Sequence, residues 1–375
     1  MSARVEIIGL PGMPEVRTGD DLPGLLLDAV TAAGEGLREG DLLVVSSKVA
    51  AKAAGLEADS SDKAAVVAAQ TVSVVAERAT AEGVTRVVRS LAGPVLAAAG
   101  VDASNTGGRD VLLLLPHDPD AVCRALRLAV QSRSGVRRLG VILSDTAGRP
   151  WRTGVADFAL GTAGVQVLDD LRGRPDADGS LLQVTTRALA DEIAAAADLV
   201  KGKVDRTPAA LVRGLAELTL DPDADAAHPG DTAEPTATAG DGGAALVRPA
   251  GPEDWFALGS QEAVRAALGV PPGTPRADQV GIRPVGPDSV NAQVQRAVAV
   301  ALVGLGDDQP AHAELEVGVD VGPADLVVTG PDPLRVGLIG ARLMTALAGE
   351  GVRHTVEFDS TTVRIHLVGA SGRAP

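Results

Sequence analysis

Short apolar runs alternate along the first half of the chain with longer segments of helical periodicity. The runs predict strands at 5–8, 42–46, 111–115 and 139–143, and the periodic segments predict helices at 62–81, 120–130 and 186–197. Asp118 and Pro119 are the expected N-cap and first helical residue of the second helix. Such alternation is typical of an α/β fold (mixed α+β), in which helices cover a sheet of buried strands.

The predicted strand 139–143 runs directly into the string SDTAGRPWR, residues 144–152. Its Gly-Arg-Pro predicts a turn that would hold Asp145 and Thr146 at the strand end. The crevice beyond the carboxyl end of such a strand is where α/β sheets bind ligands. An ordinary turn aspartate that caps its own backbone is the alternative, and this segment alone leaves both open.

A second polar segment precedes the predicted strand 111–115. It contains Asp102, Ser104, Asn105 and Thr106, followed by two glycines. Carboxylate, amide and hydroxyl oxygens suit a hard cation such as Mg²⁺ or Mn²⁺, and Asp102 and Asp145 could share one ion. A polar, glycine-rich turn without a ligand is the other interpretation.

Lysine is rare in this chain, with five among 34 basic residues. Lys48 and Lys52 follow the predicted strand 42–46 together with the hydroxyls of Ser46 and Ser47. Ammonium groups placed there could meet phosphate oxygens as point charges, or could lie on the solvated start of a helix. The chain lacks the Gly-x-x-x-x-Gly-Lys-Ser/Thr string of a Walker-type phosphate loop.

Five strings occur in a fixed order: GDLLVVSSKVAAK, AGVDASNTGG, GVILSDTAGRPWRTGVADFALG, LDDLRGRPDADG and ADEIAAAADLVKGK. Over about residues 4–219 the chain resembles the γ-glutamyl ligases that attach glutamate to the deazaflavin coenzyme F420. The resemblance implies a GTP-dependent enzyme with two divalent cations, Mg²⁺ or Mn²⁺. GTP would phosphorylate a carboxylate of the precursor F420-0, and the amine of L-glutamate would then displace phosphate from the acyl phosphate.

The resemblance also implies roles for individual residues and a homodimer. The implied metal ligands are Asp102, Asp145 and Thr146, the implied catalytic residues are Lys52 and Asp145, and the implied nucleotide contacts are Leu10, Pro11, Gly12, Met13, Ser46, Ser47, Lys52 and Asn105. Residues 207–214, with Pro208, Arg213 and Gly214, resemble a second nucleotide loop less distinctly. Ala147 replaces an aromatic residue that is usual in the family string, which affects the expected fit of substrate more than the metal site.

Composition narrows the class of protein. A net charge of −15 argues against nucleic acid or a membrane surface as partner, because both are anionic. We expect a cytoplasmic protein, since no apolar run reaches 18 residues and the N-terminus does not resemble a signal peptide. The single Cys123 is expected to be a core or surface thiol, and the five histidines lack the spacing of a zinc site.

Only five residues are aromatic, so the core must consist of Leu, Val, Ile and Ala. Trp151, inside the most distinctive string, is a candidate platform for a flat ring, with partly buried packing as the alternative.

The composition changes over 221–252 to Asp, Ala, Thr, Pro and Gly, which predicts a disordered linker. It would separate a ligase domain, 1–220, from a small α+β domain, 253–375. In the latter we predict helices at 290–305 and 334–348 and strands at 313–319, 326–329, 354–358 and 362–368.

Residues 252–264 resemble the junction to a flavin-binding, nitroreductase-like domain in two-domain relatives. The tail is shorter than that domain and lacks its paired arginines, so we expect a remnant that does not bind FMN. Two alternatives to a simple ligase stay open: a bifunctional ligase and FMN-dependent reductase, and a degenerate relative that binds nucleotide or coenzyme without catalysis.

Overall fold

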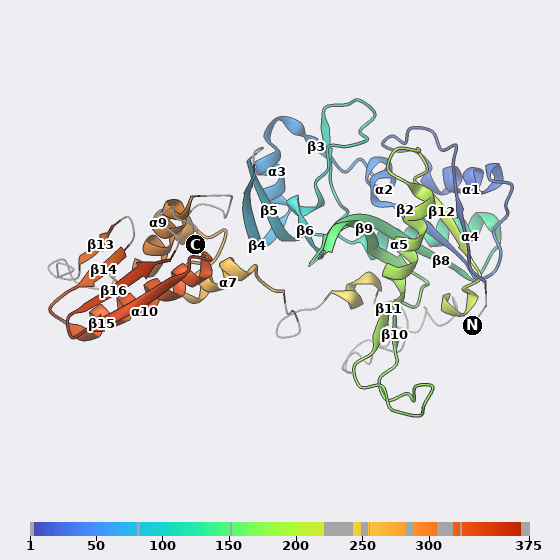
Figure 1. Cartoon of the computed structure of the whole chain (residues 1–375). Coiled ribbons are helices and arrows are strands. Elements are labelled where there is room, and N and C mark those ends of the chain that lie inside the picture. The colour runs from blue at the N-terminus through green and yellow to red at the C-terminus, as the bar shows by residue number, and fades with distance from the viewer. Residues whose placement is uncertain are drawn as a thin grey trace, which may run out of the picture. The chain divides into compact units, whose positions relative to one another are not determined.

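The computed structural model describes residues 4–80, 83–150, 152–220, 243–248, 254, 256–282, 289–305, 318–322 and 325–368. They form two compact units (Figure 1). The first unit contains the described residues of 1–71 and 90–253, and the second those of 72–89 and 254–375. Both units mix helices and strands, as predicted. None of the helices in the described part of the chain combines the length and apolar character needed to cross a bilayer.

The first unit is built on a five-stranded sheet with the order β1-β12-β2-β8-β9. The strands are β1 (Glu6–Gly9), β12 (Ala209–Arg213), β2 (Asp41–Ser46), β8 (Leu139–Arg149) and β9 (Arg152–Ala163). The pair β2 and β8 is parallel, with Ser46 opposite Ser144, and the other pairs are antiparallel. The continuous apolar run of β2 suits this central place, because a strand covered on both faces needs no polar alternation.

Helices cover both faces of this sheet. Helices α1 (Leu22–Ala32) and α4 (Pro119–Ser134) pack on one face with Leu43 and Leu143, and α5 (Leu189–Lys201) packs on the other with Leu42 and Ile142. Successive strand residues therefore point to opposite faces. Helix α4 begins as predicted, since the Asp118 carboxylate accepts the Ala121 N–H at 2.8 Å. Cys123 of α4 is a buried core thiol, and burial raises its pKa.

Shorter elements complete the first unit. They are α2 (Ser47–Ala53), α3 (Lys63–Ala69), β3 (Glu57–Asp59), β6 (Val95–Ala97), β7 (Val111–Leu113), β10 (Leu168–Asp170) and β11 (Thr186–Ala188). Strand β3 pairs with β7, and β10 with β11. A 3₁₀ turn, Gly243–Val247, packs here as well, where the Ala244 N–H donates to Asp120 at 2.9 Å. Residues 243–248 belong to the predicted linker 221–252 and are ordered here, and the rest of that segment lies outside the described residues.

The second unit joins a hairpin from the first half of the sequence to the tail. The hairpin strands are β4 (Thr71–Thr80) and β5 (Gly83–Ser90), and the tail contains α7 (Ser260–Ala267), α8 (Pro275–Val280), α9 (Val290–Leu302), α10 (Pro333–Gly349), β13 (Gly318–Val321), β14 (Asp325–Thr329), β15 (His354–Asp359) and β16 (Thr362–Leu367). The tail strands form an antiparallel sheet in the order β13-β14-β16-β15. Each tail element predicted from sequence has a counterpart, although the helix predicted at 290–305 ends at Leu302 and the strand predicted at 313–319 is found at Gly318–Val321, with 313–317 outside the described residues.

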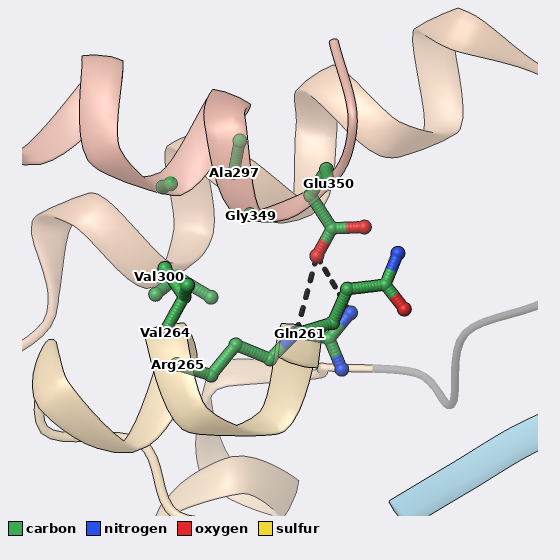
Figure 2. Close-up of a pocket in the computed structure, with 8 residues that line it drawn as sticks. Gln261, Val264, Arg265, Ala297, Val300, Gly349 and Glu350 are labelled. Atoms are coloured by element: carbon green, nitrogen blue, oxygen red, sulfur yellow. Dashed lines mark hydrogen bonds and ion pairs between the residues drawn. The ribbon is translucent and has the colours of Figure 1, made fainter. Parts of the chain in front are cut away.

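Buried charges connect the parts of the second unit. The Glu262 carboxylate of α7 accepts the Glu77 N–H at 2.9 Å and pairs with Arg78, so the hairpin packs on the tail. Figure 2 shows Arg265 of α7 reaching Glu350, with an Nη2 to Oε1 distance of 2.6 Å. These contacts explain why the hairpin groups with the tail rather than with the sheet that surrounds it in sequence.

Several predicted boundaries differ from the structure. Strand β8 does not end at Leu143 but continues to Arg149, because β9 pairs with it along this whole length. Asp145 and Thr146 thus lie within a strand rather than in a turn. The predicted helix 62–81 ends at Ala69 and gives way to β4, whose β-branched residues favour an extended backbone. Similarly, Thr186–Ala188 forms β11 before α5 begins.

The sheet that carries these strands depends on close packing against α4. A Cβ added at Gly161 of β9 would come within 2.5 Å of the Pro119 carbonyl, whereas one added at Gly148 of β8 meets nothing within 4 Å. We expect Gly161→Ala to lower the free energy of unfolding by about 1–3 kcal/mol, because α4 must move away. The control Gly148→Ala should change it by less than about 0.5 kcal/mol. Urea unfolding followed by circular dichroism measures both, and equal stabilities would contradict this packing.

Candidate functional site

Four segments that are distant in sequence meet at one edge of the first unit's sheet, where β2 ends and its parallel pairing with β8 stops. Ser46 lies opposite Ser144 in the parallel pair. The Ser46 N–H donates to the Pro208 carbonyl at 2.8 Å, and the Leu10 N–H to the Ala209 carbonyl at 2.9 Å. The loop 10–13, the pair Ser46 and Ser47, and the stretch Ser144 to Thr146 are therefore gathered at one edge, as expected for a binding site of an α/β sheet.

The strand conformation of Asp145 and Thr146 sends their side chains to opposite faces of the sheet. Asp145 points to the same side as its neighbours Leu143 and Ala147, which pack in the core under α1 and α4. Thr146 points toward α5, where it contacts Asp157. The edge therefore carries two groups of polar side chains. We call Ser47, Lys48, Asp102 and Asp145 the α2-side cluster, and Ser144, Thr146, Asp157, Lys201 and Lys203 the α5-side cluster.

Lys48 and Asp102 form the outer part of the α2-side cluster. The Lys48 Nζ lies 2.7 Å from Asp102 Oδ2 and also donates to the Ser104 hydroxyl. A backbone bridge to Leu113 of β7 fixes the position of Asp102, whose Oδ1 accepts the Ser104 N–H at 2.6 Å. Burial alone would raise the pKa of Asp102, but Lys48 and the Ser104 N–H outweigh it and hold the pKa below the ordinary value.

Asp145 is the inner carboxylate of the same cluster, and its charge is poorly compensated. Burial raises its pKa from 3.8 to about 6, and the neighbouring charge of Asp157 acts in the same direction. A hydrogen bond to Ser47, the Thr146 N–H and the charge of Lys48 offset this only in part. Lys48 thus acts on both Asp102 and Asp145.

This donor set fits a hard divalent cation. Two carboxylates with hydroxyls nearby are what Mg²⁺ or Mn²⁺ takes when substrate phosphates and waters supply its other ligands. A positive ion beside Asp145 would also compensate its buried charge. Within the described ranges, no three acidic, histidine or cysteine side chains gather as a complete metal site. The cation would therefore depend on ligands from a substrate.

Lys52 and Asn105, both implied as nucleotide contacts, lie near this edge, but Lys52 is buried in an ion pair and Asn105 is exposed. Lys52 is only 5 % exposed and pairs with the carboxylate of Glu15, just after the loop 10–13. Asn105 is exposed and has a φ of 56°, a left-handed conformation that asparagine tolerates better than most residues. Lys52 would have to exchange Glu15 for a phosphate in order to bind one.

The α5-side cluster contains residues that the sequence analysis did not select. Asp157 of β9 is buried and contacts Lys201 at 2.7 Å and Lys203 at 3.1 Å. Burial would raise the pKa of Asp157, but Lys201 and the other donors lower it to about 2. The sequence contained a signal for these residues. Lysine is rare in this chain, and its rarity singles out Lys201 and Lys203 as much as Lys48 and Lys52. These four of the five lysines flank this edge.

The sequence analysis also selected residues 207–214 and Trp151. Arg213 lies at the opposite edge of the sheet, paired with Glu6 in register and with Asp41 and Glu35 at 2.8 and 2.7 Å. Residues 209–213 form β12, which crosses the sheet, so only the start of 207–214 reaches the site, and a nucleotide contact of this segment stays a prediction. Trp151 lies outside the described residues.

Asp145 gives the first unit a pH dependence of known sign. Because its pKa is raised in the folded state, the fold gains stability from its protonation at low pH and loses it as the pH rises from about 4 through about 6. In chelator-treated protein, Asp145→Asn should thus raise the free energy of unfolding by about 3 kcal/mol at pH 7.5 and change it little at pH 4.

Urea unfolding at the two pH values measures this difference, with Asp28→Asn on the exposed face of α1 as control. The control should change stability by less than about 0.5 kcal/mol at either pH. A difference in stability between Asp145→Asn and the native chain that is independent of pH would contradict a half-buried, poorly compensated carboxylate at this position.

Comparison with known proteins assigns this part of the chain. The family model described as F420-0:Gamma-glutamyl ligase matches residues 12–214, more than half of the chain. Three similar proteins are named Coenzyme F420:L-glutamate ligase: those of Archaeoglobus fulgidus (39% identity over 227 residues, 56% of this chain and 88% of the relative), Haloarcula marismortui (36% over 255, 59% and 95%) and Methanothermobacter thermautotrophicus (36% over 226, 56% and 89%). The region matched contains both clusters, and the resemblance of the five strings is confirmed: the chain belongs to the F420-0:gamma-glutamyl ligase family.

Proposed function

We propose that the first unit ligates L-glutamate to F420-0, using GTP, in the biosynthesis of coenzyme F420. The names of the relatives support the ligase activity and the coenzyme. One observation carries the proposal to this chain: at the carboxyl ends of the parallel pair, the poorly compensated Asp145 lies with Asp102 and Lys48 inside the family region. A homodimer and a cytoplasmic location remain predictions.

The proposed reaction has two steps. An oxygen of the F420-0 carboxylate attacks the γ-phosphorus of GTP, the bond from that phosphorus to the bridging oxygen breaks, and GDP leaves. The amine of glutamate then attacks the acyl carbon, phosphate leaves with the electrons of the C–O bond, and the nitrogen loses a proton to solvent. Such chemistry needs positioning and charge neutralisation more than covalent help from side chains.

Charge explains why these residues suit the reaction. All the substrates are anionic and the chain itself carries a net charge of −15, so binding depends on local positive charge. Asp102 and Asp145 would hold a Mg²⁺ or Mn²⁺ ion, which would neutralise phosphate oxygens. Lys48 supplies an ammonium at the same place, and Gly12 in the loop 10–13 has open space around its backbone.

A direct assay tests the proposal. The purified full chain is incubated with GTP, Mn²⁺, L-glutamate and F420-0, and the coenzyme is analysed by mass spectrometry. We expect its mass to rise by one or more glutamate residues, with GDP and phosphate released in equal amounts to the amide bonds formed. Folded protein that forms no product under these conditions would contradict the proposed activity.

The role of Asp102 is tested by a matched pair on one loop. Asp102→Asn removes a charge that the cation needs, so we expect the variant to fold and its turnover to fall by about 100-fold or more, with partial recovery at high Mn²⁺. Asp110→Asn, a few residues further, removes an exposed carboxylate bonded to Ser60 and should keep turnover within about twofold. Similar turnover in both variants would move the metal site elsewhere.

Lys52 offers a second test, because its pairing with Glu15 can be separated from nucleotide binding. If Lys52 exchanges Glu15 for a phosphate, Lys52→Ala should weaken GTP binding by about tenfold, since a charge-assisted hydrogen bond is lost. Glu15→Gln should leave GTP binding unchanged or strengthen it, because it frees the ammonium. Calorimetric titration with GTP measures both. An equal loss of affinity in the two variants would show that the ion pair only shapes the loop.

A further inference from the structure

The α5-side cluster converges on one carboxylate. Asp157 Oδ2 accepts Lys201 Nζ at 2.7 Å and the Ser144 hydroxyl at 3.0 Å. Asp157 Oδ1 accepts the Thr146 hydroxyl at 2.6 Å and Lys203 Nζ at 3.1 Å. Each carboxylate oxygen thus receives two donors, and all four come from the edge at which β8 passes the proposed site.

The backbone conformation of Gly202, between the two lysines, brings both ammonium groups to Asp157. Lys201 is the last residue of α5, and Gly202 follows with φ 64° and ψ 171°. This conformation is essentially restricted to glycine, and it ends the helix so that Lys203 turns back to the same carboxylate. Lys201 is 3 % exposed, whereas the Lys203 side chain is 54 % exposed. One ammonium is therefore buried and the other is presented to solvent.

Stability alone does not account for the cluster. A buried ion pair seldom stabilises a fold more than apolar side chains of similar volume would, because desolvating the charges offsets their attraction. Lys203 is the exposed member of the two lysines, and its second carboxylate, Asp198, lies farther from the ammonium, at 3.4 Å, than Asp157 does at 3.1 Å. Moreover, the Thr146 proton is directed to Asp157, so the hydroxyl oxygen faces its other neighbours as an acceptor.

We propose that Asp157 is a positioning residue for the ligase site, and that the Lys203 ammonium it holds binds an anionic oxygen of a substrate. The oxygen belongs to a nucleotide phosphate or to a carboxylate of glutamate, an identification that rests on the proposed function. Asp157 itself is too buried to touch a substrate and acts through Lys203 and Thr146.

Steady-state kinetics with Lys203 variants distinguishes a nucleotide phosphate from a glutamate carboxylate as the group that Lys203 binds. Lys203→Met should raise the KM for one substrate by about tenfold or more, because it removes a charge-assisted contact, and leave the other within twofold. A raised KM for GTP identifies the phosphate, and a raised KM for glutamate the carboxylate. Lys203→Arg should restore most of the affinity, which a merely structural role of an exposed side chain would not predict. A Lys203→Met enzyme with both KM values unchanged overturns the proposal.

The positioning role of Asp157 is tested against a neighbour. Asp157→Asn should raise the same KM as Lys203→Met. Asp198→Asn, which removes only the 3.4 Å contact of Asp198 to Lys203, should keep both KM values within twofold. If Asp157→Asn does not fold, the Lys203 variants still decide the proposal, since their site of change is exposed. A folded Asp157→Asn enzyme with an unchanged KM for both substrates overturns the positioning role.

A second readout does not depend on activity. The chain has five lysines, so ¹³Cε and ¹⁵Nζ labelling of lysine gives few NMR signals, and single Lys→Arg variants assign them. Adding GTP with Mg²⁺, or glutamate, should shift the Lys203 signal and leave that of the exposed Lys63 of α3 unchanged. A Lys203 signal that responds in a chain without ligase activity would refute the proposed function but keep the binding role. A signal that responds to neither ligand overturns the binding role whether or not the chain is active.

Discussion

The parallel register of β2 and β8 determines where the candidate residues of the first unit lie. With Ser46 opposite Ser144, both strands reach their polar residues at the same level of the sheet. The antiparallel neighbour β12 begins there, and β1 leads into the loop 10–13 at the same edge. A register shift of one residue would send Asp145 toward α5 and Thr146 toward α1 and α4, so both clusters depend on this pairing.

The two inner carboxylates of the edge have opposite environments. Asp157 receives four donors and has a pKa lowered to about 2, while Asp145 is half-buried with weaker compensation and has a pKa raised to about 6. The first is satisfied by lysines of the chain itself. The second lacks a full partner, which is an energetic cost unless a cation is bound. Environments that separate the pKa values of neighbouring carboxylates commonly assign them different roles.

The sequence predicted which residues gather at this edge of the sheet, but not that they divide between its two faces. The apolar runs that lead into Ser46 and Asp145 are local signals, and so are the polar segment around Asp102 and the N-cap at Asp118. The continuation of β8 depends on pairing with β9, a tertiary contact that a turn signal in residues 148–150 does not reveal. Because β8 was expected to stop at Leu143, Asp145 and Thr146 were assigned to one site rather than to two faces. The position of Arg213 far from this edge had no local signal either, since only strand pairing shows that β12 crosses the sheet.

The tail was predicted well because its helices and strands have strong local periodicity, whereas its association with β4 and β5 had no local signal.

The most direct test of the proposed site is a crystal structure of the full chain with GTP and Mn²⁺, with data collected at the manganese absorption edge. We expect an anomalous peak bound by the carboxylates of Asp102 and Asp145, with the triphosphate beside Ser46 and Ser144, where the parallel pairing of β2 and β8 ends. A manganese ion and nucleotide bound elsewhere, with Asp145 still in contact with Ser47 alone at this edge, would contradict it.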